Sequence, residues 1–254
     1  MSNVELAATL KSLHVPGRPV VLANVWDAAS AKLVEAAGFP AVATSSVAVA
    51  EALGYPDQQG APVAEMLAAA ARIVRAVSVP VTVDAEAGYG LSADELVERL
   101  LATGAVGCNL EDTDYVTGSG MVDVAKQAAW LADVRAAADR AGVHLVINAR
   151  IDVVLHAGRP ADETPLVDPI VERATAYLEA GVDCVYPIAL RTPDVIRQVV
   201  AAVAPASVNG NCPPNKDGIA AAAALGVGRL SMGGGLWHVV KKELAERLAV
   251  LGAD

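Results

Sequence analysis

Hydrophobic residues recur along the chain in short runs rich in valine, and longer segments rich in alanine separate these runs. Eight of the runs have the length and continuous apolar character of strands that are buried on both faces. They cover residues 19–25, 40–46, 80–86, 106–112, 145–152, 183–189, 206–211 and 228–234. Helical patterns cover residues 28–38, 63–77, 93–104, 124–142, 169–181, 192–203, 217–226 and 236–252.

The regular alternation of strands and helices predicts a (β/α)8 barrel that spans residues 1–254 as a single domain. Glycines that can end helices support the boundaries, and they are Gly38, Gly104, Gly142, Gly181 and Gly226. A doubly wound open sheet is the alternative, but it favours a glycine-rich turn after the first strand. Here the first strand ends in "NVWDAAS", which lacks the dinucleotide-binding fingerprint. The barrel is therefore the predicted fold.

Composition and charge exclude several classes of protein. No apolar run approaches the ~20 residues needed to span a bilayer. The N-terminal "MSNVELAATLKSLHVPG" lacks the basic and apolar segments of a signal peptide, so we expect a cytoplasmic protein. A net charge of −10 argues against nucleic acid or an anionic membrane as a partner. The three cysteines have no paired spacing, so neither a disulfide framework nor a thiolate zinc site is expected.

Polar and aromatic side chains gather where the predicted strands end, which is where barrel enzymes place their chemistry. They are Trp26, Asp27, Ser45, Ser46, Asp84, Glu86, Glu111, Asp112, Asn148, Arg150, Asp152, Asn209 and Asn211. Asp84 and Glu86 are two residues apart, so in a strand both project to the same side. With Glu111 they bring three acids to one barrel mouth, and Arg150 alone cannot neutralise them. A divalent cation held by carboxylates and water, Mg²⁺, is therefore expected, with Mn²⁺ left open.

Other polar residues have structural interpretations. Three acids are explained equally well as helix N-caps, namely Asp27, Asp112 and Asp152. We expect His144 and His238 to be structural because they lie away from the strand ends, whereas His156 could reach the mouth. No lysine lies within a predicted strand, which disfavours Schiff-base and pyridoxal-phosphate chemistry. The glycines of "SMGGG" after the last strand could form a phosphate-binding turn.

Five segments resemble, in order and spacing, the isocitrate lyase and phosphoenolpyruvate mutase superfamily. They are "NVWDAASAKLVEAAGFPAVATSS", "LGYPD", "PVTVDAEAGYG", "GAVGCNLED" and "INARIDV". The resemblance implies that Asp84, Glu86 and Glu111 hold Mg²⁺, directly or through water. Glu86 stands where the family more often has aspartate. The resemblance further implies exchange of the last helix between the subunits of a homotetramer.

The resemblance also assigns substrate-binding roles. Ser45, Ser46 and Val47 match the turn that holds the carboxylate or phosphonate of the substrate. Asp57, in "LGYPD", matches an acid near the reacting centre. Arg150 matches the arginine that pairs with the anionic group of the substrate, a role that suits a bidentate guanidinium. Asn209, in the seventh predicted strand, is a further substrate-binding candidate.

One loop departs from the family pattern. The lyases carry Lys-(Lys/Arg)-Cys-Gly-His after the acid that Glu111 matches, and the cysteine is the expected proton donor. This chain has "EDTDYVTGSGMVD", so Ser119 stands at the cysteine position between two glycines that suggest a mobile lid. A serine hydroxyl is a far weaker acid than a thiol, so Ser119 cannot simply inherit that role. Asp57, Tyr89 or a water bound to the metal are the alternatives for moving protons.

These residues predict an enzyme that depends on Mg²⁺ and cleaves a C–C bond in a small 2-oxo or 2-hydroxy acid. Charge would develop on the substrate oxygen as an enolate, where a metal ion stabilises it. The alternative reaction is P–C bond chemistry, as in a phosphonopyruvate mutase or hydrolase. The alternative of another class is a barrel that binds an oxoacid without turning it over.

Overall fold

The computed structural model describes residues 1–252. Within them a parallel sheet runs in the order β1–β11–β10–β9–β8–β5–β4–β3–β2. Its strands are β1 (Val20–Leu22), β2 (Asn24–Val25), β3 (Val42–Thr44), β4 (Val81–Asp84), β5 (Gly107–Glu111), β8 (Val146–Ile151), β9 (Cys184–Pro187), β10 (Ser207–Asn211) and β11 (Arg229–Ser231). β1 and β2 are two parts of the first predicted strand, interrupted at Ala23. Because β1 pairs with β11 and β2 pairs with β3, the sheet closes into the predicted barrel.

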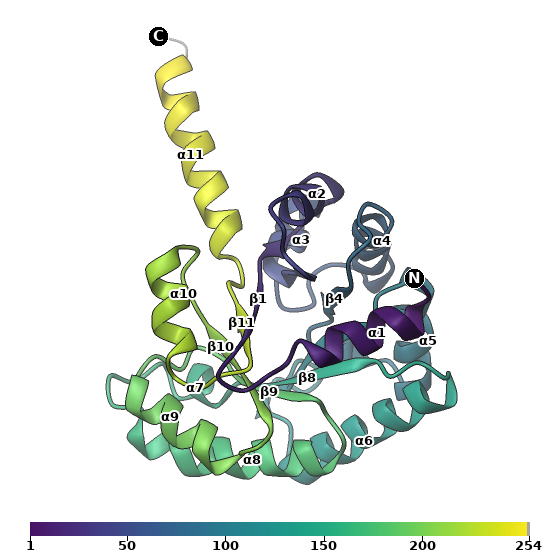
Figure 1. The fold of residues 1–254 in the computed structure, drawn as a ribbon, viewed down its shortest axis with the longest axis vertical. Coiled ribbons are helices and arrows are strands. Elements are labelled where there is room, and N and C mark those ends of the chain that lie inside the picture. Colours follow the sequence, from purple (N-terminus) through teal and green to yellow (C-terminus); the bar gives the residue numbers. More distant parts are fainter. Residues whose placement is uncertain (253–254) are drawn as a thin grey trace.

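The predicted helices are present, and all but the last of them surround this barrel (Figure 1). They are α2 (Ala28–Ala36), α4 (Val63–Val74), α5 (Ala93–Thr103), α6 (Val124–Arg140), α8 (Val167–Glu179), α9 (Pro193–Ala202), α10 (Lys216–Ala223) and α11 (Gly235–Leu251). Several elements were not predicted: α1 (Asn3–Ser12), α3 (Ser46–Leu53), the short α7 (Val153–His156) and a hairpin of β6 (Thr113–Asp114) and β7 (Gly120–Met121). Short 3₁₀ turns cover Gly88–Gly90 and Thr164–Leu166. No helix in the described part of the chain has the length and apolar character that a membrane span requires.

The hydrophobic core lies between the sheet and the surrounding helices. On β5, Cys108 and Leu110 are fully buried in the cluster that also contains Leu131 of α6. Each fully buried leucine of this kind contributes roughly 1.5–3 kcal/mol to stability. The alternate residues of the strand, Asn109 and Glu111, line the cavity at the barrel mouth instead. The alternation of a β-strand therefore separates packing from chemistry on β5.

A buried arginine fills the interior of the barrel below the mouth. Arg229 on β11 is fully buried, and its Nη2 donates to the side-chain oxygen of Asn109 at 2.9 Å. The amide nitrogen of Asn148 donates to the same oxygen, also at 2.9 Å. Because both donors take the oxygen of Asn109, its NH₂ group is left for the cavity side. The barrel interior thus fixes the orientation of one side chain at the mouth.

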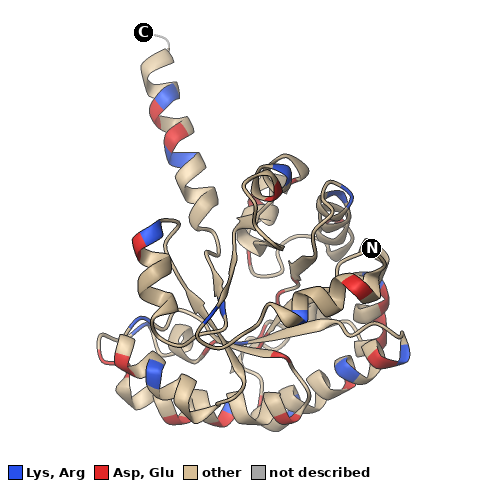
Figure 2. Ribbon diagram, in the orientation of Figure 1, with Lys and Arg blue, Asp and Glu red and all other residues tan. Residues whose placement is uncertain are grey.

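Helix α11 projects away from the barrel (Figure 1). Its foot is held by Trp237, whose indole N–H donates to Glu51 at 2.6 Å and whose ring lies 4.9 Å from that of Trp26. Beyond the foot the helix carries both signs of charge, as Figure 2 shows. It also carries six exposed large apolar side chains, Val239, Val240, Leu244, Leu248, Val250 and Leu251. Contacts within this chain therefore stabilise only the first part of α11.

Candidate active site

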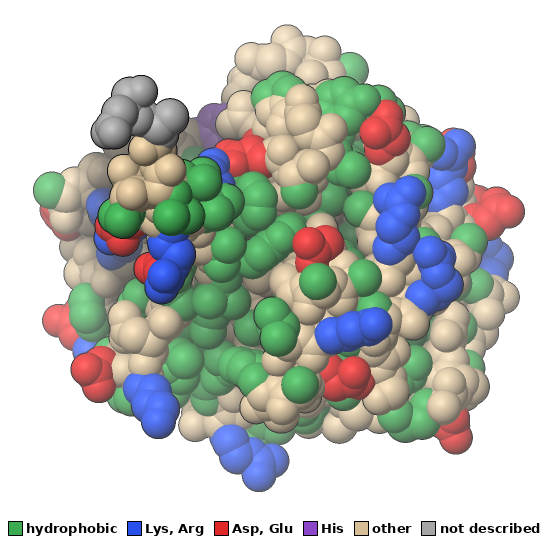
Figure 3. Space-filling model, turned by 90° about the horizontal axis from the view of Figure 1, so that it is seen from above, with side chains coloured by type: hydrophobic (Ala, Val, Ile, Leu, Met, Phe, Trp, Pro, Cys, Tyr) green, Lys and Arg blue, Asp and Glu red, His purple; other side chains and the backbone are tan. Residues whose placement is uncertain are grey.

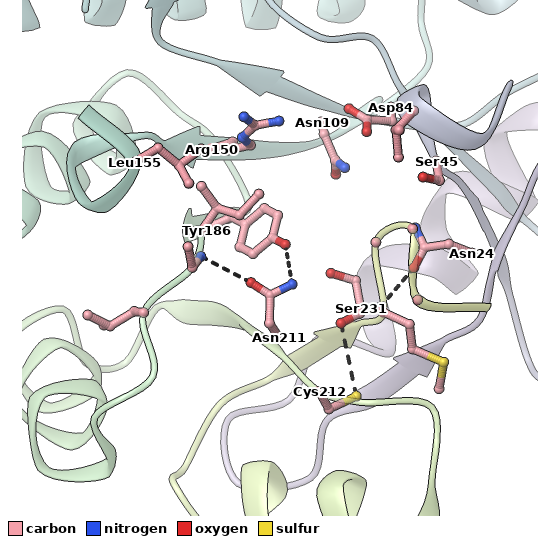
Figure 4. Close-up of a pocket in the computed structure, with 18 of the residues that line it drawn as sticks. Asn24, Ser45, Asp84, Asn109, Arg150, Leu155, Tyr186, Asn211, Cys212 and Ser231 are labelled. Carbon is pink, nitrogen blue, oxygen red and sulfur yellow. Dashed lines mark hydrogen bonds between the residues drawn. The ribbon is translucent and has the colours of Figure 1, made fainter. Parts of the chain in front are cut away.

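A cavity of about 820 Å³ opens at the carboxyl ends of the barrel strands (Figure 4). Much of its polar lining comes from the strand ends and the loops beside them: Asn24, Ser45, Ser46, Asp57, Asp84, Glu86, Asn109, Glu111, Tyr115, Arg150, Tyr186, Asn211 and Ser231. Gln58, Arg159, Arg191 and His238 add to it. Most of the residues predicted for the site are among them. The cavity is within the range of roughly 300–1,000 Å³ that is typical of small-molecule sites.

The guanidinium of Arg150 is fixed at the mouth by two carboxylates. Its Nε and Nη2 donate to the two oxygens of Asp152 at 2.6 and 3.0 Å, and its Nη1 pairs with Glu111. These negative neighbours raise the pKa of Arg150 despite its burial. A guanidinium has five N–H groups, and three are used here, so two remain for an anion in the cavity. Asp152, predicted as a possible helix N-cap, makes no cap hydrogen bond and instead positions Arg150.

Glu111 is buried between Arg150 and a tyrosine. Its Oε1 accepts the hydroxyl proton of Tyr115 at 2.5 Å, and its Oε2 faces Arg150. Burial raises the pKa of Glu111, and the positive charge of Arg150 opposes that rise. The sequence did not single out Tyr115, because it lies in the loop that follows β5 rather than at the strand end.

Asp84 ends β4 and points into the cavity. Its Oδ2 accepts the backbone N–H of Ser46 at 3.1 Å, and its own backbone N–H donates to Oγ1 of Thr44 at 2.8 Å. Its Oδ1 is buried and has no hydrogen-bond partner. A buried carboxylate oxygen without a partner is costly, so this atom is a candidate to contact a bound group.

Glu86 also lines the cavity, but not by simple alternation along a strand. β4 ends at Asp84, and Glu86 has a positive φ of 50°, in the left-handed region. Its Oε1 accepts the backbone N–H of Gln59 at 2.5 Å. Burial, with the negative charges of Asp84 and Asp57, raises the pKa of Glu86 to about 7. The turn after β4 therefore brings Asp84 and Glu86 to the same cavity. The prediction assumed the alternation of a continuous strand, whereas the structure reaches this result through a turn.

Asp57 reaches the cavity from the loop between α3 and α4. Its Oδ1 is buried without a hydrogen-bond partner. Burial is the main cause that raises its pKa, and the nearby charge of Asp84 adds to the rise. Asp57, Asp84, Glu86 and Glu111 thus line the same cavity. Within residues 1–252, however, no three acidic, histidine or cysteine side chains already converge as a complete set of metal ligands.

Ser45, Ser46 and Val47 line the cavity where α3 begins. Ser45 is the N-cap of this helix and makes no side-chain cap hydrogen bond. The first backbone N–H groups of a helix have no partner within the helix, and they favour anions. The predicted turn is therefore present, and it is the N-terminus of a helix that the sequence did not reveal.

Three predicted site residues lie outside the cavity lining. Tyr89, with a φ of 57°, packs partly buried against the core, and its hydroxyl interacts with Glu86. Ser119 is exposed at the tip of the β6–β7 hairpin, where its hydroxyl donates to Asp114 at 3.0 Å. Asn209 is fully buried deeper in the barrel, and its amide donates to Ser231 at 3.0 Å. Asn211, two residues further along β10, lines the cavity instead.

Further lining residues were not predicted, and Tyr186 and His238 are two of them. Tyr186 on β9 stands opposite Arg150 in the strand register, within a run that looks like plain core in the sequence. His238 was expected to be structural and to lie away from the mouth. The predicted position was wrong, because His238 lines the cavity, and the structural role stays a prediction. α11 begins at Gly235, directly after the last strand, so its first turn carries His238 into the lining. His156 does not line the cavity, and its ring contacts Thr113 at 3.0 Å.

The side of the cavity between α9 and α10 is apolar. Leu190, Ile196, Ala222 and Leu225 line it, together with the thiol of Cys212. Burial raises the pKa of this thiol to about 11, so it is not a thiolate at neutral pH. The cavity is thus acidic and polar at one end and hydrocarbon-lined at the other.

A closed parallel barrel with polar residues gathered at the carboxyl ends of its strands is an arrangement in which barrel enzymes carry their active sites. Residues 10–251 match the model of the phosphoenolpyruvate phosphomutase family, and the chain belongs to this family. The family lies in the PEP mutase/isocitrate lyase superfamily, as the sequence motifs predicted.

Three proteins illustrate the similarity. An oxaloacetate decarboxylase of Rhodopseudomonas palustris is 33% identical over 71% of this chain, which spans 62% of the length of that relative. The 2-methylisocitrate lyase of Escherichia coli is 30% identical over 76% of this chain and 68% of its own length. A crystal structure from Burkholderia cenocepacia J2315, provisionally assigned as a phosphonomutase, is 42% identical with a TM-score of 0.89. It matches 99% of this chain and 100% of its own.

Proposed function

We propose that the protein is an enzyme that uses Mg²⁺ to cleave a C–C bond in a small 2-oxo or 2-hydroxy carboxylic acid. The observation that carries this proposal is the juxtaposition of Asp84 and Arg150 in one cavity. The first offers a buried carboxylate oxygen without a partner, and the second offers two free N–H groups. A small acid with an anionic group and a chelating oxygen suits both.

The residues present fit Mg²⁺, which usually keeps several waters and takes only one or two carboxylates from the protein. Asp84 would hold the ion through its unpartnered Oδ1, with Glu86 and Glu111 placed to hold its waters. Bound there, Mg²⁺ would act as a Lewis acid that favours negative charge on an oxygen of the substrate.

The substrate would be oriented by the protein's own donors. The two free N–H groups of Arg150 would bind a carboxylate of the acid, and the N-terminal amides of α3 would bind its other anionic end. Asn109 would add a hydrogen bond from the NH₂ group that Arg229 and Asn148 turn toward the cavity. Asp57 would accept the hydroxyl proton when a 2-hydroxy acid is cleaved, because its Oδ1 has no hydrogen-bond partner and can act as a base.

One observation favours a second reaction, cleavage or rearrangement of a P–C bond. The Burkholderia relative that matches the whole chain is assigned as a phosphonomutase. The same arginine and helix N-terminus would accept a phosphonate as readily as a carboxylate. A binding protein without turnover is the third possibility, and the absence of the lyase cysteine is its support.

A panel assay distinguishes these possibilities. Oxaloacetate, malates with and without alkyl substituents, and phosphonopyruvate would each be incubated with the protein, with Mg²⁺ or with EDTA. Release of a keto acid from oxaloacetate or a malate supports the C–C lyase if this release is lost in EDTA. Conversion of phosphonopyruvate alone supports P–C chemistry. Binding of the acids without conversion of any of them supports the non-catalytic barrel and contradicts the main proposal.

We further propose that α11 is exchanged between subunits in a homotetramer. The helix leaves its own barrel after Trp237 and exposes Val240, Leu244 and Leu248, which follow one another at four-residue spacing along one face. Hydrophobic side chains also gather on the neighbouring upper face of the molecule (Figure 3). A second copy of the chain supplies a complementary surface for both, as in isologous interfaces.

A further inference from the structure

Tyr186 places a hydroxyl group in the cavity beside Arg150. It lies on β9, where it pairs in register with Arg150 on β8, and it is only 4% exposed. Figure 4 shows its ring extending into the cavity, with the hydroxyl facing Asn211. A buried tyrosine hydroxyl normally has a defined hydrogen-bond role, and the direction of its hydrogen bonds can be worked out here.

The hydrogen bond between Tyr186 and Asn211 has a fixed direction. The backbone N–H of Ala189 donates to the side-chain oxygen of Asn211 at 3.3 Å. That contact identifies the other side-chain atom of Asn211 as the NH₂ group, which donates to the hydroxyl oxygen of Tyr186 at 2.6 Å. The oxygen of Tyr186 is therefore an acceptor in this bond, and its own proton is directed elsewhere.

The other two tyrosines near the site are different. Tyr115 donates its hydroxyl proton to Glu111 at 2.5 Å, so that proton is already committed. Tyr89 does not line the cavity, and its hydroxyl interacts with Glu86. Within residues 1–252 no carboxylate accepts the proton of Tyr186. The hydroxyl of Ser231, which accepts from Asn209 at 3.0 Å, is its neighbour, so the proton of Tyr186 faces only a neutral group. Tyr186 is therefore the tyrosine that can give a proton to a group in the cavity.

We propose that Tyr186 is a catalytic residue that delivers a proton to the substrate carbon left by bond cleavage. When a C–C bond of the carbon next to the carbonyl or carboxylate group breaks, the other fragment leaves as a carbonyl compound or as CO₂. The electron pair of the broken bond stays on the carbon next to that group, as an enolate. The O–H bond of Tyr186 then breaks and a C–H bond forms, which leaves a tyrosinate. The donor of Asn211 and the positive charge of Arg150 stabilise the tyrosinate until water restores its proton. This inference rests on the proposed function.

Two features of the chain support this role. Burial raises the pKa of Tyr186, so the hydroxyl stays protonated and ready to donate at neutral pH. The residue at the lyase cysteine position, Ser119, is exposed and engaged with Asp114, outside the cavity lining. The proton donor of the reaction must then come from another element, and Tyr186 lies on a rigid strand inside the cavity.

Proton exchange at pyruvate tests the proposal without knowledge of the natural substrate. A group that protonates an enolate carbon in one direction removes a proton from it in the other, so the enzyme should exchange the methyl protons of pyruvate in D₂O. The rate would be followed by ¹H NMR with Mg²⁺ present. Tyr186→Phe should lower it at least about 100-fold, the usual size of general acid–base effects. The matched control is Tyr55→Phe, which removes a tyrosine hydroxyl that donates to Glu65 outside the cavity lining, and it should exchange at the wild-type rate.

Oxalate binding, measured by calorimetry on the same proteins, distinguishes failure of the role of Tyr186 from failure of the proposed function. Unchanged oxalate affinity with lost exchange in Tyr186→Phe supports the proposal. Exchange at the wild-type rate in Tyr186→Phe overturns it, as does wild-type protein that binds oxalate without exchanging pyruvate. Wild-type protein that does not bind oxalate at all contradicts the proposed function itself, and the role of Tyr186 with it.

Discussion

Arg150 donates two hydrogen bonds to Asp152, its neighbour but one on the same strand end, and this contact holds the guanidinium across the barrel mouth. The carboxylate of Asp152 is itself fully buried and accepts from Thr113 at 2.5 Å. Its backbone N–H donates to Asp112 at 2.9 Å. The position of the Arg150 guanidinium thus depends on a second layer of buried acids, Asp152 and Asp112.

Asp152→Asn should therefore weaken substrate binding more than it slows chemistry. The amide cannot pair with both Arg150 donors, so the guanidinium loses part of its orientation. We expect oxalate affinity to fall about 10-fold or more, since charged hydrogen bonds contribute ~1.5–3 kcal/mol each. Calorimetry measures this loss. Asp94→Asn is the control, because Asp94 is exposed and pairs only with Arg140 at the surface, where such pairs contribute little. Equal affinities in the two variants would contradict the positioning role.

His14 should make the fold sensitive to mild acid. It lies under the barrel, where its Nδ1 contacts the carbonyl oxygen of Leu10 at 2.8 Å and its Nε2 is buried without a partner. Burial, followed by the positive charge of Arg229, lowers the pKa of His14 from 6.5 to about 4. The unfolded chain then binds more protons than the folded chain between these values, so stability falls as the pH drops from 6.5 toward 4.

The size of that effect is measurable. Between pH 7 and pH 5 the free energy of unfolding should fall by about 2 kcal/mol, as the change in the pKa of His14 implies. Urea unfolding at both pH values would measure it, with His14→Gln as the comparison because glutamine keeps an amide donor and does not titrate. The variant should lose less stability than the wild type on acidification. A wild-type loss equal to that of the variant would show that His14 does not control this response.

The cysteine thiols should not take part in catalysis. Burial raises the pKa of both Cys108 and Cys184 to about 12, and that of Cys212 to about 11. Thiols react as thiolates, so native protein should react with iodoacetamide very slowly at pH 7.5. Turnover after such treatment should stay within about twofold of the untreated value. Rapid inactivation with modification of one cysteine would show that a thiol takes part in catalysis and would contradict this prediction.

The exposed face of α11 should control assembly. Replacing Leu244 and Leu248 together by glutamate puts charge into the proposed contact, so light scattering should show loss of the tetramer. The same helix offers a control, because Lys242 and Glu246 form an exposed pair at 2.7 Å whose replacement by alanine should leave the assembly unchanged. A doubly substituted protein that keeps the wild-type mass would exclude this face from the interface.

The sequence was sufficient for the barrel because its strands are buried on both faces and its helices end in glycines. It failed where local pattern and three-dimensional position differ. The segment of α3, "SVAVAEAL", alternates like a strand, although it forms a helix whose N-terminus lines the cavity. The signal for that helix was Ser45 at a strand end, followed by small residues that tolerate either structure.

The depth of a residue within the barrel was not predictable from alternation alone. Asn209 and Asn211 share one side of β10, but only the strand register places the first beside Arg229, inside the barrel, and the second beside Ser231 at the mouth. Tyr186 was missed for a similar reason. It lies inside an apolar run, and the predicted strand was drawn to end beyond it. The positions of Asp84, Glu111 and Arg150 at the mouth were predictable because each lies at the carboxyl end of a predicted strand, and these ends meet at one side of a barrel.

The most direct test of the central claim is a calorimetric titration of oxalate, a mimic of the pyruvate enolate, with and without Mg²⁺. Wild-type protein should bind oxalate only when Mg²⁺ is present, and Asp84→Asn should abolish this binding while Asp94→Asn retains it. Oxalate binding of equal strength in EDTA, or in the Asp84→Asn protein, would contradict a metal-supported enolate site at the mouth of this barrel.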